Sequence, residues 1–73
     1  MPAEREQVEV NGEARSMPAE GRLAALLREM EIDVQTKGVA VAVNDEIVPR
    51  ARWDDARLRP GDRVEVVRAV QGG

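Results

Sequence analysis

The sequence predicts an α+β fold, a mixed sheet of four or five strands with one main helix packed on one face. Three observations indicate it. A hairpin pattern opens the chain, one apolar helical stripe follows over residues 22–31, and valine-rich segments separated by turn residues make up the rest. No repeat or low-complexity tract divides the 73 residues. We therefore expect a single domain over residues 1–69 and a flexible tail over residues 70–73.

Alternation followed by a two-residue turn predicts the hairpin. Residues 7–10 read Gln-Val-Glu-Val, polar and apolar in turn, as in a half-buried strand. Asn11-Gly12 follows, and both residues tolerate the positive φ of a type I′ turn. The return strand is expected over residues 13–16.

The helix is predicted over residues 22–31 by four apolar residues spaced i, i+3, i+4 and i+7. These are Leu23, Leu26, Leu27 and Met30. No Ser, Thr, Asn or Asp stands just before this stripe as a side-chain cap, so the sequence does not mark where the helix starts. The polar residues 33–38 end it.

Two strands are expected directly after the helix. Residues 39–43 alternate Val and Ala, so both faces of this strand are apolar. Such a strand is central in its sheet, or a partner covers its second face. Asn44-Asp45 marks a turn, and Pro49 stops a short strand over residues 46–48.

The last strand is expected over residues 63–69, after the strong turn signal Pro60-Gly61-Asp62. Residues 50–58 read as irregular or briefly helical. The core has to be built from eleven Val, four Leu and two Ile, because the chain has no Phe or Tyr and a single Trp. A core this small leaves no room for a large buried cofactor.

Composition excludes several classes of protein. There is no Cys, hence no disulfide, no thiolate nucleophile and no Cys-based zinc site. There is no His, which removes the usual general base and the commonest metal ligand. We therefore expect neither an enzyme nor a bound metal or cofactor.

The charge and hydropathy of the chain restrict the kinds of partner that it can bind. The net charge of −3 and the pI near 4.9 argue against a nucleic-acid ligand, which needs a basic face. The longest apolar run, over residues 39–43, is far too short to span a bilayer. The first six residues form no apolar signal region, so we expect a cytoplasmic protein that does not bind membranes.

The terminal Gly72-Gly73 is the feature with the clearest chemical meaning. A terminal carboxylate becomes reactive when another enzyme adenylates it, and two glycines leave no side chain to block a narrow site. The four residues from Val70 to Gly73 reach at most about 14 Å. We expect Val70, Gln71 and Gly72 to thread into a partner and to present Gly73 there for modification.

The chain resembles the ThiS family of β-grasp, ubiquitin-like sulfur carriers. The resemblance rests on the run from Val41 to Arg50 that contains Asn44 and Val-Pro-Arg, on Trp53, on the Gly61-Asp62 turn, and on the apolar strand that runs into Gly-Gly. It covers residues 8–73, and only the charged N-terminal extension over residues 1–7 departs from the family's pattern.

The resemblance implies a cofactor-free protein substrate in thiamine biosynthesis. A ThiF-like adenylyltransferase would use ATP to adenylate Gly73. A cysteine desulfurase or another persulfide donor would then convert the adenylate to a thiocarboxylate, and thiazole synthase would take up the sulfur.

A docking surface is expected on the open face of the sheet. If the Val residues of the third strand face the helix, Ala40 and Ala42 face away, and Val67 and Ala69 extend the same apolar patch. The alternative is that another segment of the chain covers them. Arg68, beside the tail, is a further candidate for contact with acidic groups of a partner.

Three residues of the family motif have a structural interpretation. As the one large ring, Trp53 is expected to cap an end of the sheet, Pro49 to end a strand, and Arg50 to bond loop carbonyls. Direct contact with a partner is the alternative.

Other functions stay open on the sequence alone. The small subunit of molybdopterin synthase resembles this fold and its Gly-Gly end, although the Val-Pro-Arg…Trp motif argues against it. A ubiquitin-like protein modifier that forms isopeptide bonds through Gly73 and a β-grasp binding module with an incidental Gly-Gly are the others.

Overall fold

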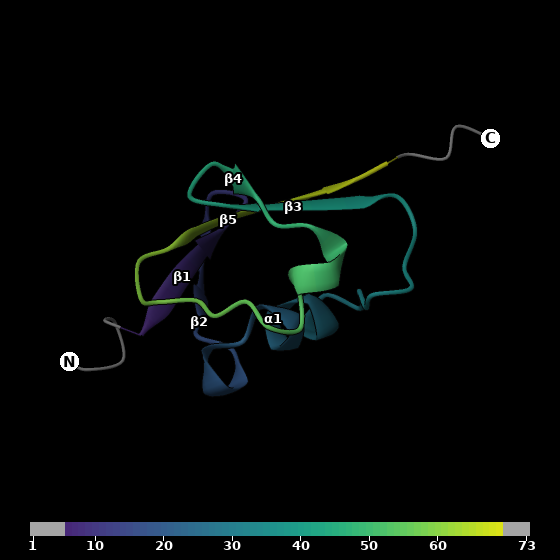
Figure 1. Cartoon of the computed structure of the whole chain (residues 1–73). Coiled ribbons are helices and arrows are strands. Elements are labelled where there is room, and N and C mark those ends of the chain that lie inside the picture. The colour runs from purple at the N-terminus through teal and green to yellow at the C-terminus, as the bar shows by residue number, and fades with distance from the viewer. Residues whose placement is uncertain (1–5, 70–73) are drawn as a thin grey trace.

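The structure is a computed structural model that describes residues 6–69 (Figure 1). Its elements in chain order are β1 (Gln7–Val10), β2 (Glu13–Ser16), the 3₁₀ turn η2 (Ala19–Gly21), α1 (Leu23–Glu29), β3 (Val39–Val43), β4 (Glu46–Ile47), the 3₁₀ turn η3 (Arg50–Arg52) and β5 (Arg63–Arg68). The first three predicted strands over residues 7–10, 13–16 and 39–43 are confirmed at these bounds. The brief helix expected within residues 50–58 is η3.

The five strands form one mixed sheet in the order β2-β1-β5-β3-β4. β5 lies at its centre, parallel to β1 and antiparallel to β3, while β2 and β4 pair with their hairpin neighbours at the two edges. The predicted mixed sheet is confirmed, and β3 lies between β5 and β4, so it is not an edge strand.

Both hairpin turns have the left-handed backbone that their residues predict. Asn11 and Gly12 have φ values of 52° and 86°, and Asn44 and Asp45 have values of 51° and 72°. Positive φ at both central positions is the type I′ geometry, whose twist matches that of the flanking strands.

The helix is shorter than predicted, because it ends at Glu29 and not at residue 31. Glu31 adopts φ 66°, and the N–H of Ile32 donates to the carbonyl of Leu27 at 2.8 Å. The N–H of Glu31 donates to the carbonyl of Arg28 at 2.9 Å. These two bonds form a Schellman motif, which closes the helix one residue before the last residue of the apolar stripe, Met30.

The start of α1 is capped by a distant part of the backbone. Arg22 is the N-cap residue and makes no side-chain capping bond. Instead the N–H of Leu23 donates to the carbonyl of Ala56 at 3.1 Å, and the N–H of Leu58 donates to Gly21 at 2.7 Å. The chain after η3 thus takes the place of the Ser or Asp that the sequence lacks.

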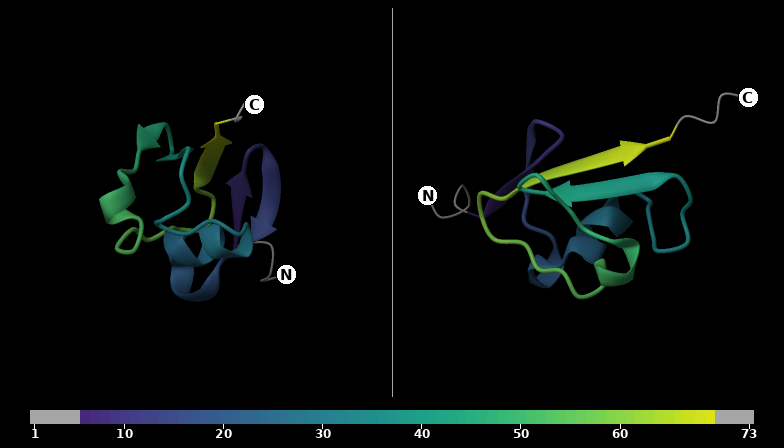
Figure 2. Two further views of the ribbon diagram at one scale, coloured as in Figure 1. Left: turned by 90° about the vertical axis from the view of Figure 1, so that its right-hand side faces the viewer. Right: turned by 45° about the horizontal axis from the view of Figure 1, so that its top comes forward.

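The core lies between the sheet and one covering layer, which consists of α1 and the segment around η3 (Figure 2). Its buried residues are Val8, Val10, Leu23, Leu26, Leu27, Ile32, Val41, Trp53, Leu58, Val64 and Val66. Trp53 is the largest of them and is 1% exposed. The predicted strands over residues 46–48 and 63–69 each end one residue earlier, although the N–H of Val48 still donates to Val41 at 2.8 Å.

Candidate docking face and chain exit

One face of the sheet is covered by the helix, and part of the other face is apolar and open. Val41 is 1% exposed on the covered face, whereas its neighbour Ala40 is exposed. Ala40 pairs across the strands with Val67, which is 62% exposed. Ala42 is half-buried. The prediction that the Val residues of β3 face the helix and the Ala residues face away is therefore confirmed.

Ile47 belongs to the same face, and the sequence interpretation missed it. It is 71% exposed and pairs with Ala42. A signal was present in the sequence, because the two-residue turn at Asn44-Asp45 fixes the register of β4 against β3 and so places Ile47 opposite Ala42. We call Ala40, Ala42, Ile47 and Val67 the docking face.

Charged residues lie on the open side of the sheet near the start of β5. Glu65 pairs with Ala42 across β5 and β3, and Glu9 pairs with Arg63 across β1 and β5. All three charged residues are exposed. Val67 and Ala40 therefore lie toward the end of β5 from which the chain leaves the sheet, whereas Ala42 and Ile47 lie level with Glu65.

The two remaining docking candidates lie at that exit. Ala69 is exposed, and its N–H donates to the carbonyl of Gly38 at 2.6 Å. Arg68 pairs with Val39 and belongs to the other side of the sheet, where its Nη2 donates to the carbonyl of Met30 at 2.7 Å. Arg68 thus does not share a face with Ala40, Ala42 and Val67, and a partner would meet it from the side of the helix.

The residues of the Val-Pro-Arg…Trp motif hold one another in place. The Nε1–H of Trp53 donates to the carbonyl of Val48 at 3.0 Å. Arg50 donates through Nη1 to the carbonyl of Val34 at 2.7 Å, and its guanidinium lies 4.5 Å from the centroid of the Trp53 ring. Pro49 is the N-cap of η3. These contacts confirm that Arg50 bonds a loop carbonyl, as the structural interpretation predicts.

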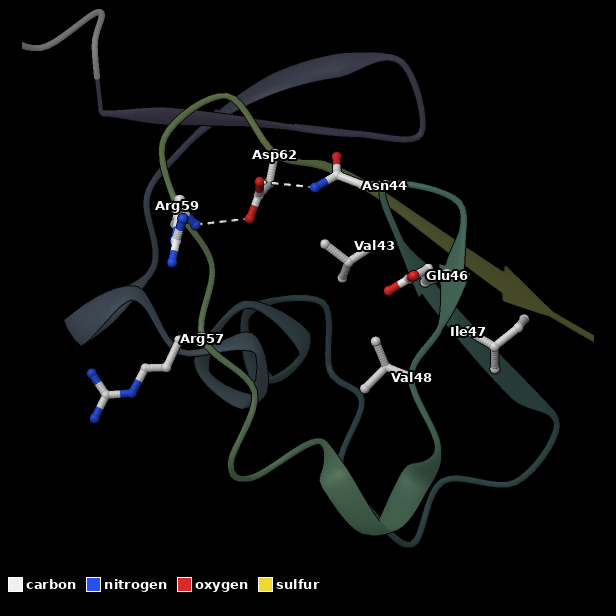
Figure 3. A pocket seen from close by; sticks show the side chains of 8 residues that line it. All are labelled: Val43, Asn44, Glu46, Ile47, Val48, Arg57, Arg59 and Asp62. Carbon is white, nitrogen blue, oxygen red and sulfur yellow. Dashed lines mark hydrogen bonds between the residues drawn. The ribbon is translucent and has the colours of Figure 1, made fainter.

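An open hollow of about 490 Å³ lies between β4 and the chain over residues 57–62 (Figure 3). Val43 and Val48 point into it, while Arg57 points away. On its rim, Asp62 accepts the Nδ2–H of Asn44 at 3.0 Å and the N–H of Arg59 at 2.8 Å. The charged side chains of Glu46 and Arg59 also line the hollow.

Within residues 6–69 no three His, Cys, Asp or Glu side chains gather as metal ligands would. No polar or charged side chain in that range is buried. None of its helices has the length and apolar character needed to cross a membrane. What the described part of the chain offers is a surface, with apolar residues beside the point where the chain leaves the sheet.

The expected site of modification lies outside the described residues. Gly73, and the threading residues Val70, Gln71 and Gly72, all follow Ala69, the last residue that the structure describes. Their roles stay predictions.

A family profile, a related sequence and a solved structure all match most of the chain and all carry the name ThiS. The sequence profile of the ThiS family matches residues 4–73. A sulfur carrier protein ThiS of Thermus thermophilus is 46% identical over 65 residues, which are 88% of this chain and 95% of that protein. The crystal structure of a thiamine biosynthesis protein (ThiS) from Geobacter metallireducens superposes with a TM-score of 0.70 at 26% identity, covering 92% of this chain and 99% of that one.

A further relative is much longer. A thiazole synthase of Paramagnetospirillum magneticum is 38% identical over 64 residues, which are 88% of this chain but 19% of that protein. The chain therefore matches about a fifth of a larger polypeptide.

Proposed function

Because the chain belongs to the ThiS family, we propose that it is a sulfur carrier for the thiazole moiety of thiamine, a protein substrate and not an enzyme. The observation that carries this proposal is the family match, which extends to Gly73 and so includes the Gly-Gly end. The described residues agree with such a role, since they form a folded body with an open apolar face. We place the protein in the cytoplasm, with the enzymes that would act on it.

The longer relative supports thiazole synthase as the partner that receives the sulfur. In that protein a segment similar to this chain is part of a polypeptide named thiazole synthase. Joining two proteins in one chain raises their effective concentration, which benefits proteins that act on each other. We infer that the chain described here binds a thiazole synthase as well.

The proposed chemistry takes place at Gly73. Its carboxylate attacks the α-phosphorus of ATP on a ThiF-like adenylyltransferase, which forms the acyl adenylate and releases pyrophosphate. The terminal sulfur of a persulfide, supplied by a cysteine desulfurase or a similar donor, attacks the acyl carbon and displaces AMP. A thiol then cleaves the resulting S–S bond, which leaves the thiocarboxylate on Gly73 and a disulfide on the donor side.

We propose that the docking face holds the carrier on its partners during these steps. Val67 and Ile47 are 62% and 71% exposed, and together with their strand partners Ala40 and Ala42 they form one apolar patch of the kind that marks an interaction site. Ala40 and Ala42 lie between them and have short side chains, so a partner can approach the backbone of β3 closely. Ala69 and Arg68 stand at its border, beside the exit of the chain.

Mass spectrometry of the intact protein tests the chemistry. With ATP, the cognate activating enzyme and a sulfur donor, we expect a gain equal to the difference between one sulfur and one oxygen atom. A chain that lacks Gly73 is the control, and it should fold like the full chain but show no gain. An unchanged mass of the full chain with a competent enzyme would refute the carrier proposal.

The substitution Val67→Asp tests the docking face. A carboxylate on the apolar face should raise the KM of the activating enzyme for the carrier by about tenfold or more, because docking would bury it without a countercharge. Glu65→Gln is the matched control, since it changes an exposed charge on the same strand at the border of the face. Equal KM values for the two variants would show that the partner binds elsewhere.

The two other functions for a Gly-Gly end have distinct readouts. Restored growth of a thiazole auxotroph supports the proposal, whereas restored growth of a molybdopterin auxotroph only would support a pterin pathway. Lysine conjugates that depend on Gly73 would indicate a protein modifier.

A further inference from the structure

The central strand β5 continues past the end of its parallel neighbour β1. The register between them ends at Val10 with Val64, and the N–H of Asn11 still donates to the carbonyl of Val64 at 2.9 Å. At Asn11, with φ 52°, the chain turns away into β2. From Val66 onward, β1 offers β5 no further backbone partner.

The side chain of Asn11 takes the place of that missing backbone. Its Oδ1 accepts the N–H of Val66 at 2.9 Å, and its Nδ2–H donates to the carbonyl of Val66 at 3.2 Å. An amide side chain carries the same donor and acceptor as a peptide group, so β5 is bonded on this side for one further residue. The last described residues of β5 follow directly.

Gly38 holds the opposite side of the same stretch. Its carbonyl accepts the N–H of Ala69 at 2.6 Å. Its φ of 74° is one that residues with a side chain rarely adopt, and a Cβ there would lie 3.2 Å from the Cβ of Ala69. Both the bond and the close approach depend on glycine at this position.

A third contact comes from the helix layer. Nη2 of Arg68 donates to the carbonyl of Met30 at 2.7 Å, and Met30 is the C-cap of α1. A cation beside the free carbonyls of a helix end is favourable. The backbone of β5 is thus held from both neighbouring strands and from the helix within the four residues before position 70.

We propose that Asn11, Gly38 and Arg68 form an exit clamp, which sets the direction in which residues 70–73 leave the sheet and so positions Gly73 in the partner's active site. This inference rests on the proposed function, because it assigns the three residues a role in the reaction at Gly73. They are positioning residues, since they act through β5 and do not touch the reacting atoms.

The short reach of the tail explains why the direction matters. Four residues span at most about 14 Å, so for a tail held extended in the partner's site a change of about 20° in direction at Ala69 would displace the end by about 5 Å. Misplacing a reacting group by 1 Å can cost about a hundredfold in rate. Docking through the face on β3, β4 and β5 would be unaffected, because the clamp residues lie outside that face.

The experiment compares the steady-state kinetics of ATP–pyrophosphate exchange by the activating enzyme with three carrier variants. Asn11→Gly keeps the backbone of the turn and removes the amide, and Gly38→Ala disturbs the other side of the exit. Asn44→Gly is the matched control, because Asn44 also occupies a left-handed turn position and also bonds β5, but at Arg63, the start of that strand. All are assayed well below their melting temperatures.

We expect Asn11→Gly and Gly38→Ala to lower kcat about tenfold or more with KM within twofold of the wild type, and Asn44→Gly to leave both unchanged. If Asn11→Gly matches Asn44→Gly in kcat, Asn11 is only a structural residue and the proposal is overturned. Failure of the wild-type carrier to support exchange would instead count against the proposed function.

NMR relaxation tests the effect of the clamp on the mobility of β5 without any enzyme. In Asn11→Gly the amide order parameters of Val67 and Ala69 should fall, whereas in Asn44→Gly they should equal those of the wild type. Equal order in the two variants would overturn the clamp, whatever the enzyme assay gives.

Discussion

The β1–β2 turn begins with Asn11 at φ 52° and the β3–β4 turn begins with Asn44 at φ 51°, and in both turns the side-chain amide bonds to β5. The two amides act at different ends of that strand. Asn44 accepts the N–H of Arg63 at 2.9 Å, where β5 starts, and Asn11 pairs with Val66, shortly before the chain leaves the sheet.

The bonds also differ in what else they require. Asn11 exchanges both of its bonds with the backbone of one residue, so they depend only on β5 lying beside β1. Asn44 donates its second bond to the carboxylate of Asp62 at 3.0 Å, and Asp62 in turn accepts the N–H of Arg59 at 2.8 Å. One turn mimics a strand, and the other joins a side-chain network. Turns with one backbone geometry can therefore contribute to stability in different ways.

The largest effect is expected for Asn11→Ala. The variant loses two hydrogen bonds, worth about 1 kcal/mol each, and forces Ala into a left-handed conformation that costs about 1 kcal/mol. Urea unfolding should show a free energy of unfolding lower by about 2–3 kcal/mol. Asn11→Gly removes the conformational cost, so it should lose less than Asn11→Ala. Equal losses in the two variants would show that only the amide matters.

A smaller effect, with a different pattern, is expected for Asn44→Ala. Its amide is exposed, so water replaces part of what is lost, and we expect a loss of about 1–2 kcal/mol. The double variant with Asp62→Ala should lose about 0.5–1 kcal/mol less than the sum of the single losses, because the two side chains share a bond. Asn11→Ala combined with Asp62→Ala should be additive. A non-additive loss for Asn11→Ala with Asp62→Ala would contradict the view that the two turns stabilise the fold independently.

The strands could be predicted from the sequence because their signals are local. Alternation marks the strands over residues 7–10 and 39–43, and the two-residue turns set where each hairpin strand ends and which residues pair. All of these signals come from residues close together in the sequence. The same alternation predicts the docking face at Ala40 and Ala42. Ile47 could have been added from the register of the turn.

What the sequence did not reveal depends on contacts between distant segments. The cap of α1 comes from Ala56, and the partner of the Asn11 amide is Val66, 55 residues away. Neither contact has a local pattern, because both exist only once the topology has placed β5 beside β1 and the segment after η3 beside the helix. The predicted end of α1 was wrong for a different reason. Glu31 adopts φ 66° without being Gly or Asn, the residues that announce a helix end.

Glu31 provides a contrast to the two Asn turns, since it is left-handed and none of the side-chain hydrogen bonds within the described residues involves it. We expect Glu31→Gly to raise the free energy of unfolding by about 0.5–1 kcal/mol, because Gly relieves the conformational cost and retains the Schellman bonds. Asn11→Gly should change stability in the opposite direction. If both substitutions destabilise, the Glu31 side chain has an interaction that the fold does not explain. Thermal unfolding of the two variants side by side decides this.

The smallest effect concerns the ion pair at the second turn. Nη2 of Arg63 lies 3.4 Å from Oδ2 of Asp45, and these side chains are 58% and 75% exposed. Solvent screens such a pair, and Asn tolerates the φ of 72° at this position as well as Asp does. Asp45→Asn should therefore change the free energy of unfolding by less than about 0.5 kcal/mol, and high salt should remove the difference. A larger loss that persists in high salt would mean that Asp45 is part of the network of Asn44 and Asp62. The second turn would then stabilise β5 through a charge as well as through an amide, whereas Asn11 acts through its amide alone.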